Sequence, residues 1–130
     1  MTKIFVYGTL LRGLGNWNWA LQDQTFVGTA ETLPDFYMVS VGGFPGVCPG
    51  GETAIQGEVF EVDDARLIEI DRLEGYRKDN PKGGMYDKIL ITLADGTEAY
   101  MYTFNSPRNL SVIESGSWRQ HTGRYLKNNA

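Results

Sequence analysis

A hairpin in the second half of the chain is the feature that most narrows the fold. Residues 86–93 and 97–104 are rich in β-branched and aromatic side chains, and Asp95-Gly96 between them is a favoured tight turn. One face of the first strand carries Ile89, Ile91 and Leu93, and the return strand carries Tyr100, Tyr102 and Phe104. The sequence therefore predicts two antiparallel strands joined by a short turn.

The remaining segments add further strands and only short helices. We expect strands at residues 3–7, on both sides of Pro34-Asp35 within 25–41, and at 54–62, where Gly57 indicates a bulge or a close backbone contact. Residues 42–51 have the composition of a loop, and short helices are predicted at 16–21, 65–74 and near 119–126. Many strands with few helices favour an α+β fold or a barrel over a doubly wound sheet.

Composition limits the class of protein. The chain has 130 residues, 42% of them hydrophobic, so one domain spanning residues 1–130 is expected. A net charge of −4 argues against a nucleic-acid partner, and no apolar run approaches the ~20 residues of a membrane helix. The N-terminal apolar run is too short for a signal peptide, and one cysteine excludes an internal disulfide. We expect a cytoplasmic location; the oligomeric state stays open.

The N-terminal strand runs directly into a glycine turn. Residues 4–7 fit a buried strand, and Gly8 permits backbone angles or a close approach that a side chain would forbid. The N–H groups of Thr9, Leu10 and Leu11 could then face inward and form a concavity for an anion or a polarised carbonyl. An ordinary turn after a core strand is the alternative.

The helix predicted at 65–74 carries an acidic residue on its apolar side. Successive helical residues advance by about 100°, which places Leu67, Ile70 and Glu74 on one face, with Gly75 available to end the helix. A carboxylate aimed at the interior is costly unless it has a partner or a chemical role. The alternative is a glutamate that bends outward at a frayed helix end.

Several chemistries can be set aside. The glycines after the first strand do not complete a dinucleotide-binding loop, and no phosphate-loop motif is present. One histidine and one cysteine match no zinc pattern, so neither a metal nor a cofactor is expected. A dyad of Cys48 and His121 requires a proximity that the sequence does not establish. An interior carboxylate and an amide-lined turn remain, and together they suit proton transfer near a carbonyl.

These motifs resemble those of a known family. Val6-Tyr7-Gly8-Thr9-Leu10, Leu73-Glu74-Gly75 and Gly84-Met85-Tyr86 are similar to the corresponding segments of the γ-glutamylcyclotransferase-like (AIG2-like) family, as are Phe44-Pro45-Gly46 and residues 113–118. The resemblance spans nearly the whole chain. It implies a small mixed β-barrel flanked by short helices and a small-molecule γ-glutamyl substrate.

The resemblance also implies site residues. Tyr7, Gly8, Thr9 and Leu10 would grip the γ-glutamyl group, and Glu74 would act as general base and acid in forming 5-oxoproline. Tyr86 would position the substrate or serve as a core aromatic residue, and Tyr125 is a weaker candidate of the same kind.

Two functions follow from this set of residues. The first is a cyclotransferase that acts on a γ-glutamylamine or γ-glutamyl peptide, with the polar loop at 77–84 as a variable rim. The second is a binding module that keeps the pocket for a small carboxylated ligand without turnover. Glu74 favours the enzyme, because an anion-binding pocket gains little from an interior carboxylate.

Overall fold

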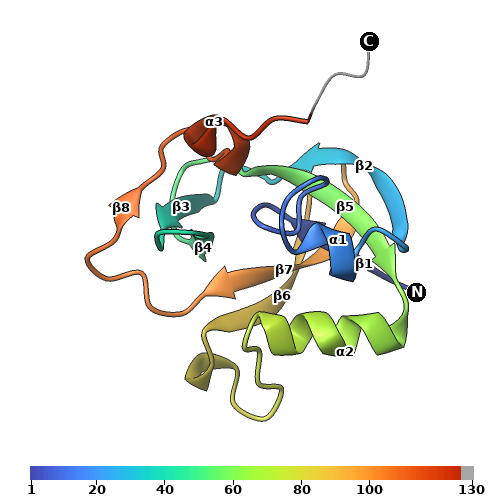
Figure 1. Cartoon of the computed structure of the whole chain (residues 1–130). Coiled ribbons are helices and arrows are strands. Elements are labelled where there is room, and N and C mark those ends of the chain that lie inside the picture. Colours follow the sequence, from blue (N-terminus) through green and yellow to red (C-terminus); the bar gives the residue numbers. More distant parts are fainter. Residues whose placement is uncertain (127–130) are drawn as a thin grey trace.

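The computed structural model describes residues 1–126 and contains strands with few helices (Figure 1). In chain order the elements are β1 (Thr2–Val6), α1 (Trp17–Ala20), β2 (Thr25–Glu31), β3 (Phe36–Ser40), β4 (Pro45–Pro49), β5 (Gln56–Val62), α2 (Asp64–Leu73), the 3-10 turn η1 (Pro81–Gly83), β6 (Tyr86–Thr92), β7 (Glu98–Phe104), β8 (Ser111–Val112) and α3 (Trp118–Thr122). The predicted α+β class is confirmed.

The strands form two sheets. A five-stranded sheet has the order β2-β5-β1-β7-β6, in which only the β1–β7 pairing is parallel, and a three-stranded sheet has the order β4-β3-β8. One isolated bridge, Thr32 with Leu93, links the ends of the two edge strands of the larger sheet. Among residues 1–126 the sheets do not close into a barrel, so the expectation of a barrel was wrong in that respect.

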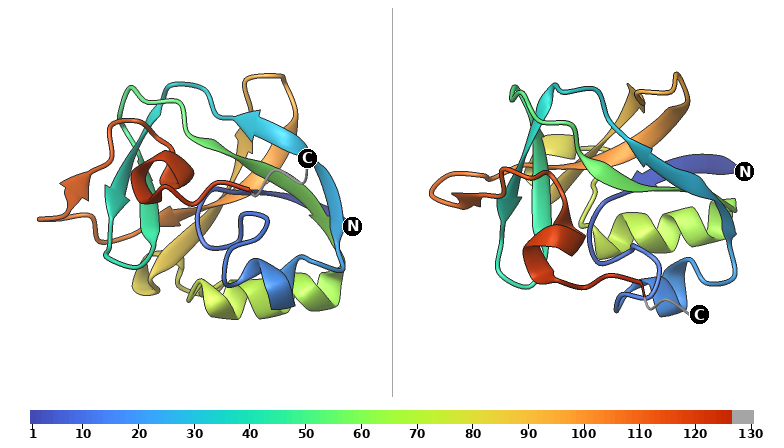
Figure 2. Two further views of the ribbon diagram at one scale, coloured as in Figure 1. Left: turned by 45° about the horizontal axis from the view of Figure 1, so that its top comes forward. Right: turned by 90° about the horizontal axis from the view of Figure 1, so that it is seen from above.

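The core lies around β1, the central strand of the larger sheet. Ile4, Phe5 and Val6 are each at most 3% exposed, because hydrogen-bonded strands flank β1 on both sides. Helix α2 packs on this core through Ile70, and α1 lies beside α2 (Figures 1 and 2). The Arg66 guanidinium fixes that pair by donating to the backbone carbonyls at the end of α1.

The predicted hairpin is confirmed as β6 and β7, with Thr92 opposite Glu98 across the turn at Asp95-Gly96. The close contact expected at Gly57 is also present, because a Cβ there would meet the Val6 carbonyl oxygen. The register irregularity lies instead on the neighbouring β2, between Phe26 and Gly28.

The loop predicted at 42–51 was wrong over residues 45–49, which form β4. The glycines and prolines of this segment led to the loop prediction, because these two residue types usually interrupt strands. Pro45 and Pro49 occupy the two ends of an edge strand, and Gly46 permits Phe104 to approach so closely that a Cβ would meet its side chain at 2.6 Å. The last helix is shorter than predicted, because Gly123 adopts a φ of 70° and ends α3. No helix in the described part of the chain is long and apolar enough to cross a membrane.

Candidate active site

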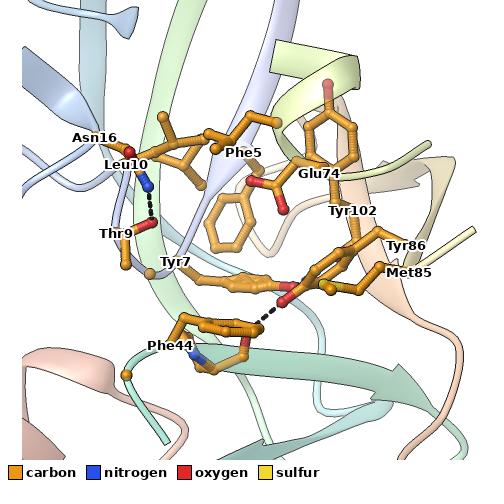
Figure 3. Close-up of a pocket in the computed structure, with 15 residues that line it drawn as sticks. Phe5, Tyr7, Thr9, Leu10, Asn16, Phe44, Glu74, Met85, Tyr86 and Tyr102 are labelled. Atoms are coloured by element: carbon orange, nitrogen blue, oxygen red, sulfur yellow. Dashed lines mark hydrogen bonds between the residues drawn. The ribbon is translucent and has the colours of Figure 1, made fainter. Parts of the chain in front are cut away.

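A cavity of about 420 Å³ opens where the end of β1, the end of α2, the start of β6 and the segment entering β4 meet (Figure 3). Its lining consists of Phe5, Val6, Tyr7, Gly8, Thr9, Leu10, Asn16, Gly43, Phe44, Pro45, Leu73, Glu74, Met85, Tyr86 and Tyr102. The six residues proposed from the sequence, Tyr7, Gly8, Thr9, Leu10, Glu74 and Tyr86, all line this one cavity.

The turn after β1 is held in shape by its own hydrogen bonds and by Asn16. The Leu11 amide donates to the Gly8 carbonyl at 3.0 Å, and Asn16 contacts Thr9 through its backbone N–H and its side-chain amide, at 3.1 and 2.8 Å. Within residues 1–126 the N–H groups of Gly8, Thr9 and Leu10 donate no hydrogen bond. The turn therefore offers unused donors. Asn16 lies at the N-terminal end of α1, but its side chain makes no capping bond to that helix.

Gly8 is required for a close approach and not for an unusual backbone angle. It is absent from the glycines with positive φ, so a side chain meets no backbone strain there. A Cβ on Gly8 would instead lie 2.8 Å from the Pro45 ring. Pro45 of β4 therefore occupies the space that a side chain on Gly8 would need. Gly8 thus lets the turn pack against the opposite wall.

The end of α2 places Glu74 at the cavity. Gly75 adopts a φ of 66°, its N–H donates to the Arg72 carbonyl, and the Tyr76 N–H donates to the Asp71 carbonyl. These two bonds are a Schellman motif, so the prediction that Gly75 ends the helix is confirmed. A Cβ on Gly84 would meet the Gly75 carbonyl oxygen. The two glycines therefore allow the helix end to pack directly against the chain that enters β6.

The Glu74 carboxyl group lies toward the cavity (Figure 3). It forms no hydrogen bond or ion pair with residues 1–126. Burial, and secondarily the charge of Asp71, raise the pKa of Glu74 to about 7. A carboxyl group with this pKa exchanges a proton readily near neutral pH, as a general acid–base requires.

Three tyrosines build the walls around Glu74. The hydroxyl of Tyr7 donates to the Tyr102 carbonyl at 2.7 Å, and that of Tyr86 donates to the Pro45 carbonyl at 2.6 Å. Burial raises the pKa of both phenols, which therefore stay neutral and donate their hydroxyl hydrogens to backbone carbonyls. The two tyrosines therefore shape the cavity, and neither phenol is available to ionise near neutral pH.

Tyr102 connects the cavity to a charged pair behind it. Its hydroxyl donates to the Asp71 carboxylate at 2.5 Å, and Lys88 lies 2.9 Å from the other Asp71 oxygen. Sequence reasoning placed Tyr102 on a strand face without a role, and it did not identify Asp71. The signal was present in part, because Asp71 precedes Glu74 by one helical turn.

The other candidates lie outside the cavity. Cys48 is buried, its thiol donates to the Phe104 carbonyl, and burial raises its pKa, which is the opposite of an activated nucleophile. His121 is exposed and stacks on Trp118, away from the cavity lining. Tyr125 is 64% exposed and does not line the cavity either.

Comparisons with known proteins agree with this architecture. A family model described as gamma-glutamyl cyclotransferase, AIG2-like, matches residues 4–120. The gamma-glutamylcyclotransferase family protein YtfP of Escherichia coli K12 is 36% identical over 117 residues, covering 89% of this chain and 95% of YtfP. Among solved structures, an AIG2-like protein from Mus musculus has a TM-score of 0.75 and 28% identity, covering 100% of this chain and 98% of that one. A uropathogenic Escherichia coli-specific protein has a TM-score of 0.78 and 26% identity, covering 96% and 98%. The chain belongs to the gamma-glutamyl cyclotransferase, AIG2-like family.

Proposed function

We propose that the protein is a γ-glutamyl cyclotransferase that converts a γ-glutamylamine or γ-glutamyl peptide to 5-oxoproline and a free amine. One observation carries this proposal. Glu74 is a carboxyl group with a pKa of about 7 inside a cavity that also contains a turn, and among residues 1–126 neither this carboxyl group nor the N–H groups of Thr9 and Leu10 in that turn have a hydrogen-bond partner. Family membership supports a γ-glutamyl substrate.

The substrate's charges match the two polar features of the cavity. A γ-glutamyl group carries an α-ammonium and an α-carboxylate on the same carbon. The ammonium would lie against Glu74, and the anionic oxygens would accept hydrogen bonds from the N–H groups of Thr9 and Leu10. No lysine or arginine lines the cavity in the described chain, so backbone amides are the donors at hand for an anion.

The reaction then needs only proton transfers by Glu74. Its carboxylate takes a proton from the α-ammonium, and the freed amine attacks the γ-carbonyl carbon of the same molecule. A new C–N bond closes the five-membered ring, and the bond between that carbon and the departing nitrogen breaks. Glu74 returns its proton to the departing nitrogen and is again a carboxylate. The second proton of the ring nitrogen passes to the released amine, which leaves as an ammonium ion. Holding the γ-glutamyl chain curled between the turn and the tyrosine walls would supply much of the rate gain, because the attack is intramolecular.

A substrate panel tests the proposal. The protein is incubated with γ-glutamylamines and γ-glutamyl peptides, and released 5-oxoproline is measured alongside calorimetric binding. Turnover of at least one compound above the uncatalysed rate is expected. Binding of these compounds without any 5-oxoproline would overturn the proposal and establish the binding module in its place.

A further inference from the structure

We propose that an apolar subsite at the mouth of the cavity, formed by Leu73, Met85 and Phe44, receives the leaving amine, so that the enzyme prefers γ-glutamyl compounds whose leaving amine is apolar and uncharged. This inference rests on the proposed cyclotransferase function. It concerns the part of the substrate that the γ-glutamyl site does not contact.

Two of these side chains line the cavity and still face solvent. Met85 is 51% exposed and Leu73 is 39% exposed, although both belong to the cavity wall. Phe44 is partly buried and packs against the core. Large apolar side chains that are exposed and contiguous with a cavity mark a surface that a ligand covers. Methionine also adapts its shape to ligands of different outline.

The subsite lies beside the reacting group. Leu73 directly precedes Glu74, and a Cβ built on Gly75 would lie only 3.3 Å from the Met85 Cβ, so Met85 is held against the helix end. Figure 3 shows Thr9 and Asn16 on one side of the cavity and Met85 on the other, with Glu74 between them. A substrate whose anionic end is bound at the turn therefore directs its leaving nitrogen past Glu74 toward Met85.

The charges around the mouth disfavour an acidic leaving portion. The polar loop at 77–84, which was expected to form a variable rim, contains Arg77, Lys78 and Lys82, but none of these three residues lines the cavity. Lys82 forms an ion pair with Asp87 at 3.2 Å, and Lys88 is bound by Asp71. A carboxylate on the leaving amine would find apolar side chains and the carboxyl group of Glu74, which repels it when ionised.

A matched pair of substrates measures the preference. γ-Glutamyl-n-butylamide and γ-glutamyl-β-alanine have leaving portions of similar length, but only the second ends in a carboxylate. We expect kcat/KM to be at least tenfold higher for the butylamide. Along an ethyl, propyl and butyl series, kcat/KM should rise by about two- to fourfold per methylene, the effect of burying that group from water.

One substitution and its control locate the subsite. Met85→Lys should shift the ratio of the two kcat/KM values toward β-alanine by about tenfold or more. Leu90→Lys is the control, because Leu90 lies on β6, the strand that directly follows Met85, is 54% exposed and does not line the cavity. It should leave the ratio unchanged. Equal effects of the two variants, or a parent ratio below about twofold, would overturn the subsite while the cyclotransferase function stands.

The two proposals fail in different ways. If no compound yields 5-oxoproline, the proposed function fails, and the subsite is judged by calorimetric binding of the same matched pair to Glu74→Gln. Weaker or equal binding of the butylamide would then overturn the subsite as well. Sedimentation velocity of the parent and of Met85→Lys completes the test. If the parent is a dimer, Met85→Lys is a monomer and the ratio of the two kcat/KM values is unchanged, the apolar surface binds a second copy of the chain and not the leaving amine.

Discussion

Replacing Glu74 by glutamine should remove a pH dependence from the stability of the fold. The environment raises the pKa of Glu74 from 4.5 to about 7, chiefly through burial. The native protein therefore holds a proton on Glu74 more tightly than the unfolded chain does between these pH values, and its stability falls as the pH rises through this interval. Glutamine has the same shape and never ionises.

The expected effect is large enough to measure. Each unit of pKa difference corresponds to about 1.4 kcal/mol, so the ionised Glu74 costs the native state about 3 kcal/mol above pH 7. The free energy of unfolding of Glu74→Gln, minus that of the parent, should be constant below pH 4.5. It should then increase by about 3 kcal/mol up to pH 8.

Urea unfolding of both proteins at several pH values between 4 and 8.5 measures this difference. Glu52→Gln is the control, because Glu52 is exposed and lies outside the cavity. It should show no comparable trend. A flat difference for Glu74→Gln would refute the argument from burial. A variant less stable than the parent above pH 7 would show that Glu74 has a cationic partner.

Three further outcomes are expected. Gly8→Ala should lower the free energy of unfolding by about 1–3 kcal/mol and raise KM, because the added Cβ must displace the Pro45 ring. Chemical unfolding and steady-state kinetics on one preparation measure both effects, and values equal to those of the parent would show that the turn shifts to accommodate the Cβ. Asp71→Asn should lower the pKa of Glu74 because it removes a nearby negative charge, while burial keeps that pKa above 4.5. NMR titration of the Glu74 carboxyl carbon measures this pKa, and an unchanged value would show that the charge of Asp71 does not contribute to it. Gly75→Ala should destabilise the protein by about 1 kcal/mol in thermal unfolding, because its φ of 66° is unfavourable for alanine, and an unchanged Tm would mean that the helix end relaxes.

Local patterns in the sequence predicted much of the geometry of the candidate site. The 100° spacing of residues along α2 predicted that Glu74 shares a helix face with Ile70, and the Ile70 side chain is completely buried in the structure. Gly75 ends that helix as its position suggested, and the turn after Tyr7 lines the same cavity. These predictions succeeded because helix periodicity and glycine caps depend on residues close in the chain.

The features that were missed depend on contacts between distant segments. Pro45 and Pro49 fit a strand only because β4 lies at a sheet edge, which no local pattern reveals. The contact of Asn16 with Thr9 requires a specific fold of the turn, and the bond from Tyr102 to Asp71 joins β7 to α2. The larger sheet likewise stays open because the ends of its edge strands, β2 and β6, meet only at the bridge between Thr32 and Leu93, and a contact between such distant segments has no local sequence pattern.

The rate of 5-oxoproline release by the parent and by Glu74→Gln tests the proposed role of Glu74 most directly. Both proteins are assayed at neutral pH on the best substrate of the panel, with binding of 5-oxoproline measured to confirm an intact cavity. The account predicts that Glu74→Gln binds 5-oxoproline and loses about 10²–10⁴ in kcat, the usual contribution of a general acid–base. A kcat within about threefold of the parent would contradict it, because so small a loss is inconsistent with a missing general base.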